Sequence, residues 1–247
     1  MVIRTAALAA IAALVFSSAP AAQSAPAPAQ TPTVQQQNEE IIKELRAIRQ
    51  LLERLTQPAP REPQTAKLTN LTGYALGSPD APLTMVEFTD LQCPFCRQFA
   101  TTTFDSIKRN WIDTGKLRYI SRDLPLDVLH AQATNAARAA RCAGEQNKFW
   151  EMRWTLMKNA NLLSPAYISK VAADLKLDTN AFSACTASTK FDAAIQADMD
   201  EAQRIGIAGT PTFIVGKTTP AGIEGPLIVG ALDYSRFDAK FKEVLAR

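Results

Sequence analysis

Cysteine is the residue type with which this chain of 247 residues could do chemistry. The chain holds four cysteines and a single histidine, and two of the cysteines form the motif Cys93-Pro94-Phe95-Cys96. The C-x-x-C spacing lets two sulfur atoms close a small disulfide ring, and it is typical of thiol–disulfide exchange. The motif therefore predicts redox chemistry with Cys93 and Cys96 as the catalytic pair.

Metal binding is the main alternative for a pair of cysteines. A structural zinc site needs four ligands, usually with a second close pair, whereas His130, Cys142 and Cys185 are widely separated in the sequence. The sequence therefore predicts no metal site and no cofactor. Copper binding by Cys93 and Cys96, as in a copper chaperone, stays open as an alternative function, and His130 is assigned to the surface or to a helix start.

The motif follows a segment with the composition of a buried strand. Leu83–Thr89 (LTMVEFT) is expected to form this strand, and a helix is expected to begin at Cys93. The amino terminus of a helix offers unpaired N–H groups and a positive dipole end. Both features stabilise a thiolate, so Cys93 is predicted to be the attacking sulfur and Cys96 the resolving one.

Residues 67–247 have the pattern of one α/β domain. The 47% of hydrophobic residues suffice for a core, and a net charge of +3 without runs of Lys or Arg argues against nucleic-acid binding. Further strands are expected at Lys116–Ser121, Pro211–Val215 and Leu227–Val229. Helices are expected at Ala131–Met157 (with Trp150 and Trp154 in the core), Ser164–Leu175, Asn180–Ala187 and Asp233–Leu245. This order predicts a sheet interrupted by a helical insertion over about residues 128–200.

The first 22 residues have the features of a secretory signal peptide. Arg4 precedes an apolar run at residues 6–16, and small residues follow at 19–22. The run is shorter than the roughly 20 residues that a membrane-spanning helix needs. We therefore expect export to the periplasm or secretion, hence an oxidising compartment, with a Pro/Ala-rich tether at residues 23–33.

A heptad pattern over Val34–Thr56 predicts an amphipathic helix that associates with copies of itself as a coiled-coil stalk. Ile41 and Ile48 fall at d positions and Leu45 at an a position. Because Leu at a with Ile at d disfavours two-stranded coils, we expect a trimer or a tetramer. A proline-rich linker at residues 57–66 separates the helix from the domain; packing of the helix on its own domain is the alternative.

Three segments resemble the DsbA-like branch of the thioredoxin superfamily, and they occur in the order found in that family. They are residues 86–96 (VEFTDLQCPFC), 139–150 (AARCAGEQNKFW) and 209–213 (GTPTF). The resemblance implies a thioredoxin fold with an inserted helical domain. It also implies a cis bond before Pro211, close to the cysteines, where the backbone of Thr210 pairs with a bound substrate chain.

The resemblance lends roles to three further residues. Glu87 matches the family's buried acidic residue beneath the active site, where a carboxylate can relay the proton of Cys96. A glutamate at the sheet edge, facing water, is the alternative. Cys142 and Cys185 are expected to form a structural disulfide in the insertion, as in some family members, while free thiols or a second redox pair stay open.

Phe95 stands where the best-known DsbA oxidases carry histidine. Since phenylalanine gives the thiolate no hydrogen bond or charge, we expect a less lowered pKa of Cys93, a weaker oxidant and an apolar rim for substrates. The weaker oxidant, the oligomerising stalk and Thr210, a residue type found before the cis-proline of disulfide isomerases in this superfamily, favour an isomerase or reductase. The arrangement resembles the oligomeric suppressor-of-copper-sensitivity (ScsC) proteins. A monomer-competent dithiol oxidase is the alternative. The expected partners are substrate proteins with thiols or disulfides and a membrane protein that recharges the cysteines.

Overall fold

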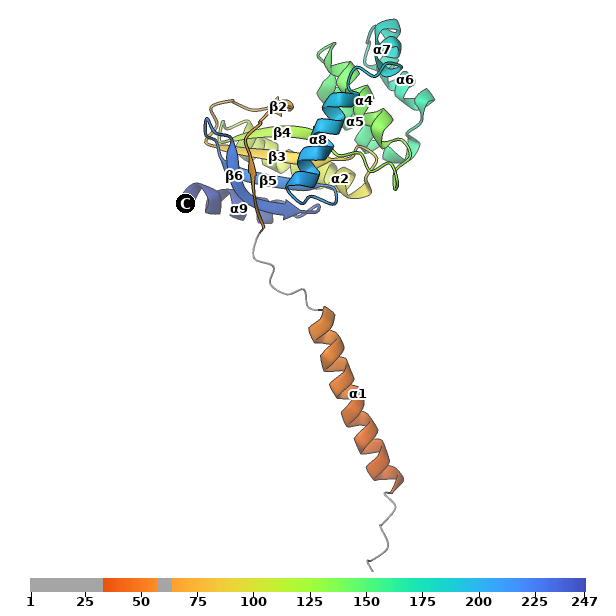
Figure 1. Cartoon of the computed structure of the whole chain (residues 1–247), viewed down its shortest axis with the longest axis vertical. Helices are drawn as coiled ribbons and strands as arrows, with labels where there is room; N and C mark the ends of the chain where they lie inside the picture. Colours follow the sequence, from red (N-terminus) through yellow and green to blue (C-terminus); the bar gives the residue numbers. More distant parts are fainter. Residues whose placement is uncertain (1–32, 57–63) are drawn as a thin grey trace, which may run out of the picture. The chain divides into compact units, whose positions relative to one another are not determined.

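The computed structural model describes residues 33–56 and 64–247. The chain divides into two units, residues 1–60 and residues 61–247. In the first unit, helix α1 extends over Val34–Thr56, the range that the heptad pattern predicts (Figure 1). The predicted signal peptide, residues 23–32 of the predicted tether and residues 57–63 of the predicted linker lie outside the described residues.

The second unit is built on a six-stranded sheet with the order β1-β6-β5-β3-β4-β2. Its central strand β3 (Leu83–Thr89) runs parallel to β4 (Leu117–Asp123) and antiparallel to β5 (Thr212–Lys217). The outer strands are β1 (Thr65–Leu68), β2 (Tyr74–Leu76) and β6 (Ile223–Val229). All residues of β3 are buried, including the polar residues Thr84, Glu87 and Thr89.

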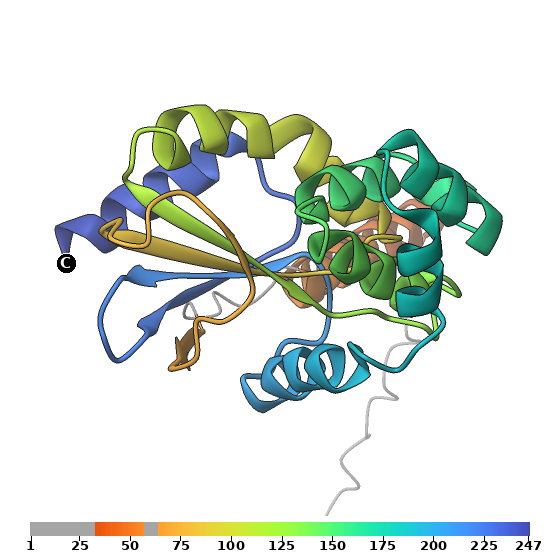
Figure 2. The ribbon, with the colours of Figure 1, turned by 90° about the horizontal axis from the view of Figure 1, so that it is seen from above.

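Helices cover both faces of the sheet (Figure 2). One face packs against α9 and against a continuous helical segment, while α8 packs against the other face. The continuous segment comprises α2 (Pro94–Gln98), η1 (Phe99–Thr103), α3 (Phe104–Ile107) and η2 (Lys108–Ile112). The flanking helices are α8 (Asp192–Arg204) and α9 (Tyr234–Ala246).

The helical insertion lies between β4 and β5, and the predicted fold class is confirmed. Besides α8, it contains α4 (Ala133–Gly144), α5 (Phe149–Lys158), η3 (Ala160–Leu162), α6 (Pro165–Asp174) and α7 (Thr179–Thr186). Together with Cys93 and Cys96, these helices form a separate hydrophobic core.

The structure differs from the sequence predictions in one predicted helix and in three elements that the sequence did not predict. The helix predicted over residues 131–157 is broken into α4 and α5, because the chain turns at residues 145–148 and Asn147 adopts a φ of 60°. A Cβ atom on Gly144 would lie 2.5 Å from Tyr74 Oη, so the close packing at this turn requires glycine. Strands β1 and β2 were missed, and β1 begins at Thr65 within the predicted linker, because strands of three or four residues are too short to show a periodic pattern. Helix α8 was missed as well.

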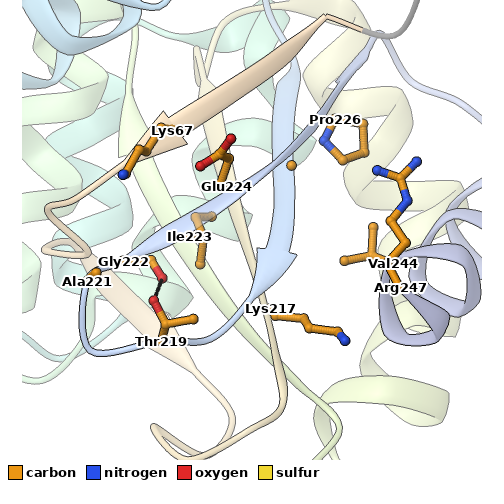
Figure 3. Close-up of a pocket in the computed structure, with 11 residues that line it drawn as sticks. Lys67, Lys217, Thr219, Ala221, Gly222, Ile223, Glu224, Pro226, Val244 and Arg247 are labelled. Atoms are coloured by element: carbon orange, nitrogen blue, oxygen red, sulfur yellow. Dashed lines mark hydrogen bonds between the residues drawn. The ribbon is translucent and has the colours of Figure 1, made fainter.

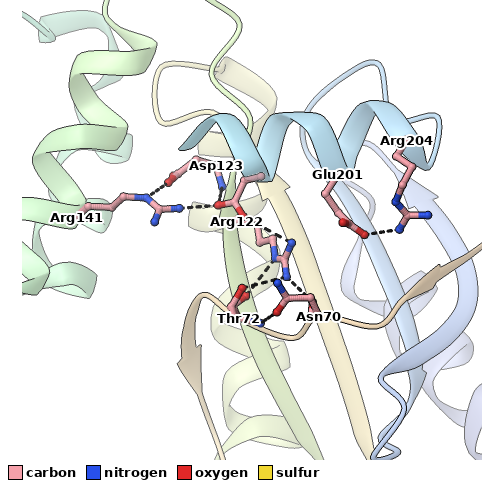
Figure 4. Close-up of polar contacts among 8 residues, drawn as sticks. Asn70, Thr72, Arg122, Asp123, Arg141, Glu201 and Arg204 are labelled. Carbon is pink, nitrogen blue, oxygen red and sulfur yellow. Dashed lines mark hydrogen bonds and ion pairs between the residues drawn. The ribbon is translucent and has the colours of Figure 1, made fainter. Parts of the chain in front are cut away.

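A buried ionic network joins the insertion to the sheet (Figure 4). Arg141 of α4 donates to Asp123 Oδ2 at the end of β4 (2.5 Å) and to Asp198 Oδ2 of α8 (2.6 Å). Arg122 Nη1 lies 3.6 Å from Asp198 Oδ1. Burial, together with the charge of Asp123, raises the pKa of Asp198 to about 6. These contacts hold α4 and α8 in place relative to β4.

Candidate active site

The two cysteines of the motif lie where the central strand passes into a helix. Cys93 is the N-cap residue of α2, and Pro94 occupies the first helical position, where its missing N–H costs nothing. The backbone N–H of Cys93 donates to Asp90 O (3.1 Å). Cys93 is 4% exposed and Cys96 is fully buried, whereas Phe95 between them is 60% exposed. The arrangement therefore places Cys93 at the helix start and Cys96 beneath it.

The surroundings of the two sulfur atoms drive their pKa values apart. The pKa of Cys93 is lowered to about 5, chiefly by a hydrogen bond from the Cys96 thiol, with contributions from Thr210 and from backbone groups of Cys96 and Phe95 that outweigh the effect of burial. Burial, the Cys93 thiolate and the charge of Glu87 raise the pKa of Cys96 well above its usual value. At neutral pH these shifts favour a thiolate on Cys93 and a protonated thiol on Cys96.

The Thr210–Pro211 peptide bond is cis and lies beside Cys93. The Cys93 Sγ atom is 3.5 Å from the Thr210 carbonyl oxygen. Pro211 is buried, and its carbonyl accepts a hydrogen bond from the backbone N–H of Gly230 (2.8 Å). The structure thus brings two regions together that are 117 residues apart in the sequence.

Glu87 is buried on β3, but its carboxylate has charged and polar partners that the sequence did not predict. Arg153 of α5 donates from Nη2 to Glu87 Oε2 (2.6 Å), and the hydroxyl of Tyr119 donates to the same oxygen. Arg153 also donates from Nε to Ser121 Oγ on β4 (3.1 Å). Both charged side chains are at most 1% exposed. Glu87 is therefore not exposed to water at the sheet edge, which was the alternative prediction.

The sequence did contain a signal for Arg153. It lies on the same helical stripe as the buried residues Phe149, Met152 and Leu156, where a solvated arginine would not be expected. Its guanidinium also packs against two tryptophans, with Cζ 4.2 Å from the ring centroid of Trp154. Trp150 and Trp154, which were predicted to be core residues, are only partly buried. They line a cavity of about 350 Å³ between α3 and α5.

Asp90 is a second residue that the sequence did not single out. Its buried carboxylate accepts hydrogen bonds from the backbone N–H of Gln92 (2.7 Å) and of Leu126 (2.9 Å). It also pairs with His130 Nδ1 at 2.8 Å. His130 precedes α4 as expected, but it is partly buried and holds the segment after β4 against the turn that leads to Cys93.

Cys142 of α4 and Cys185 of α7 form a disulfide. Their Cα atoms are 5.8 Å apart, and 43 residues separate them in the sequence. The bond lies within the insertion, whereas Cys93 and Cys96 are free thiols. Among the described residues, no group of three or more His, Cys, Asp or Glu side chains is arranged to hold a metal ion.

A separate hollow of about 270 Å³ lies at the other end of the sheet (Figure 3). It is lined by Lys67, Lys217, Thr219, Ala221, Gly222, Ile223, Glu224, Gly225, Pro226, Val244 and Arg247. Lys217 pairs with Leu83 at the start of β3, whereas the cysteines follow the end of that strand. The hollow is therefore remote from the cysteines.

The fold is DsbA-like, with the C-x-x-C pair and the cis-proline loop side by side at the end of β3. The thioredoxin family profile matches residues 69–223. The chain therefore belongs to the thioredoxin family. Alpha-DsbA1 from Wolbachia pipientis is 25% identical with a TM-score of 0.63, over 78% of this chain and 95% of that one. The catalytic domain of Proteus mirabilis ScsC is 22% identical with a TM-score of 0.55, over 76% of this chain and 93% of that one.

Curated relatives match over a shorter segment. The Na(+)/H(+) antiporter NhaA 3 of Salinispora tropica is 37% identical over 142 residues, which are 58% of this chain. The match spans only 21% of the antiporter. In the part of this chain that the structure describes, no helix is long and apolar enough to cross a membrane. The similarity is thus to a fragment of the antiporter chain.

Proposed function

We propose that this chain exchanges disulfides with client polypeptides through Cys93 and Cys96, as an isomerase or reductase that assembles through α1. The observation that carries the proposal is the contact between Cys93 Sγ and the Thr210 carbonyl, in a pair whose outer thiol has a pKa of about 5. A substrate chain that pairs with the backbone of Thr210 would bring its own sulfur to Cys93. The exposed ring of Phe95 offers an apolar contact beside the sulfur.

The reaction follows from the difference between the two thiols. The Cys93 thiolate attacks a client disulfide, forms a mixed disulfide and releases one client thiolate, which takes up a proton. A client thiolate can then attack the mixed disulfide, which isomerises the client and regenerates Cys93. Alternatively, Cys96 loses its proton and attacks Cys93, which leaves the client reduced and the protein oxidised. Glu87 is the proposed proton acceptor in this second route.

Helix α1 supports assembly into a homo-oligomer. Five of its large apolar side chains are exposed in the single chain: Val34, Ile41, Ile42, Leu45 and Ile48 are 47–73% exposed. A helix of this length with an uncovered apolar stripe needs a partner in water. A trimer or tetramer would hold several active sites near one client and raise their effective concentration. We place this assembly in the periplasm or outside the cell, where a membrane redox partner would recharge the cysteines.

Dithiol oxidation is the second candidate function, and the lowered pKa of Cys93 favours it. A stabilised thiolate favours the reduced form of the protein, which makes its disulfide a stronger oxidant. An oxidase donates the Cys93–Cys96 disulfide to client thiols and needs only one active site.

Refolding of scrambled ribonuclease separates the two candidates. The reduced full-length protein should restore ribonuclease activity, and Cys93→Ser should abolish this. Ile41→Gln with Ile48→Gln should lower the mass measured by light scattering and weaken the rescue, whereas Lys43→Gln on the opposite side of α1 should change neither. Oxidation of a dithiol peptide without rescue of ribonuclease would favour the oxidase. A mass unchanged by the paired substitutions would rule out assembly through α1.

A further inference from the structure

We infer that Arg153 is a positioning residue of the redox site, which holds Glu87 Oε2 so that Oε1 is left to accept the proton of Cys96. The inference rests on the proposed thiol–disulfide exchange and concerns only the step in which Cys96 resolves the mixed disulfide. It makes the insertion helix α5, which carries Arg153, a part of the redox machinery.

The two oxygens of Glu87 have different surroundings. Oε2 accepts hydrogen bonds from Arg153 Nη2 and from the hydroxyl of Tyr119, whereas Oε1 is buried and has no partner. Burial raises the pKa of Tyr119 well above its usual value, so its hydroxyl stays protonated and donates. Because no donor in the structure occupies the lone pairs of Oε1, this oxygen is the one that is free to accept a proton.

Helix α5 brings Arg153 to the cysteine motif. Helix α2, with Cys96, packs against α5, and Met152 lies in the same core cluster as both cysteines of the motif. The negative charge of Glu87 raises the pKa of Cys96, and a negative charge on Cys96 raises the pKa of Arg153. The charged and titratable groups around this point are Glu87, Tyr119, Cys93 and Cys96, with Asp123 contributing to the field at Arg153.

A guanidinium suits this position because it keeps its charge at any pH and donates in fixed directions. A buried carboxylate without a counter-charge would be very costly and would take up a proton instead. A protonated Glu87 can no longer accept the proton of Cys96. Arg153 therefore makes Glu87 available as a base. Its hydrogen bond to Ser121 Oγ holds the guanidinium against β4.

The resolving step balances as follows. The Cys96 thiol gives its proton to Glu87 Oε1, and the resulting thiolate attacks Cys93 Sγ of the mixed disulfide. The Cys93–Cys96 bond forms while the bond between Cys93 and the client sulfur breaks. The client sulfur leaves as a thiolate and takes a proton from solvent, and Glu87 later returns its proton to solvent. The protein loses two electrons and the client gains them.

Arg153→Met tests the inference in the full-length protein. Reduced protein is mixed with a peptide disulfide, quenched with acid and analysed by mass spectrometry between about pH 5 and pH 9. We expect the mixed disulfide on Cys93 to form at the parent rate, because the substitution leaves the net charge beneath Cys93 unchanged. The Arg153–Glu87 pair of the parent is neutral, and so is a protonated Glu87 in the variant. We expect its resolution at pH 7 to slow by about tenfold, with the pH profile of this step moved to higher pH. Arg153→Lys keeps the charge and should restore most of the rate.

Arg141→Met is the matched control. Arg141 is also a buried arginine paired with carboxylates in the insertion, but its partners are Asp123 and Asp198 rather than Glu87 (Figure 4). It should lower the thermal midpoint and leave the pH profile of resolution unchanged. Should Arg153→Met not fold, Tyr119→Phe removes a donor to the same carboxylate oxygen and should slow resolution without slowing mixed-disulfide formation.

Four results would overturn the inference. The first is resolution at the parent rate and with the parent pH profile in Arg153→Met, and the second is equal slowing of mixed-disulfide formation and resolution in that variant. The third is a shift of the same size in the pH profile of Arg141→Met. The fourth, if Arg153→Met does not fold, is an unchanged rate of resolution in Tyr119→Phe. The proposed function fails in a different way, because the parent protein would then form no mixed disulfide with the peptide at all.

Discussion

The reactivity of Cys93 should follow a titration with a midpoint at about pH 5. At pH 7 about 99% of such a thiol is ionised, compared with about 1% of a thiol with the ordinary pKa of 9.0. The largest cause of the shift is the hydrogen bond from the Cys96 thiol, so Cys96→Ala should move the midpoint to higher pH. Alkylation of the reduced protein by iodoacetamide, read by mass spectrometry, measures the midpoint. Cys96 should stay unmodified because it is fully buried and its raised pKa keeps it protonated.

The same shift has a thermodynamic consequence. Because the folded pKa of Cys93 lies below the ordinary value, ionisation stabilises the reduced folded protein fully above pH 9, and this stabilisation is lost as the pH falls through 5. At pH 7 it amounts to about 3 kcal/mol. The disulfide form has no such stabilisation, because Cys93 does not titrate there. The reduction potential of the Cys93–Cys96 couple should therefore be about 60 mV higher than with an ordinary thiol pKa, which makes the disulfide a stronger oxidant. The reduction potential of the Cys93–Cys96 couple is measured from its equilibrium with reduced and oxidised glutathione.

Two outcomes would refute this reasoning. A midpoint for Cys93 near pH 8 to 9 would mean that the helix start and the Cys96 thiol do not stabilise the thiolate. An unchanged midpoint in Cys96→Ala would mean that another group lowers the pKa. A Phe95→Ala variant is the matched control, because the Phe95 ring is exposed, only the backbone N–H of this residue contributes, and alanine adds no donor.

Three further predictions concern stability. Replacing Cys142 and Cys185 by alanine should lower the unfolding free energy by about 4 kcal/mol, from the closed loop of 43 residues, and a urea midpoint that does not fall would contradict this. Gly144→Ala should lower the thermal midpoint, since the added Cβ meets Tyr74 at 2.5 Å; an unchanged midpoint would show that Tyr74 moves aside without cost. Asp198 has a folded pKa of about 6 against 3.8, so its contribution to stability grows as the pH falls from 6 to 4. Asp198→Asn should remove that pH dependence in urea unfolding, and an identical dependence in the variant would refute it.

Much of the redox site could be predicted from the sequence alone. The C-x-x-C motif, the apolar strand before it and the helix that begins at Cys93 are local features, because spacing and periodicity along a short segment specify them. The alternation along β3 also determined that Glu87 shares a face with Met85 and Leu83. Resemblance to known sequences added Thr210, Pro211 and the pairing of Cys142 with Cys185.

Tertiary structure alone decided which groups surround the sulfur atoms. Arg153 is 66 residues from Glu87 and His130 is 40 residues from Asp90, and no local pattern states that these side chains meet. Such pairs form because the insertion packs over one end of the sheet and buries charges that must then find partners. The edge strands β1 and β2 escaped prediction for a related reason, since a strand of three or four residues is stabilised by the neighbour it pairs with rather than by its own composition.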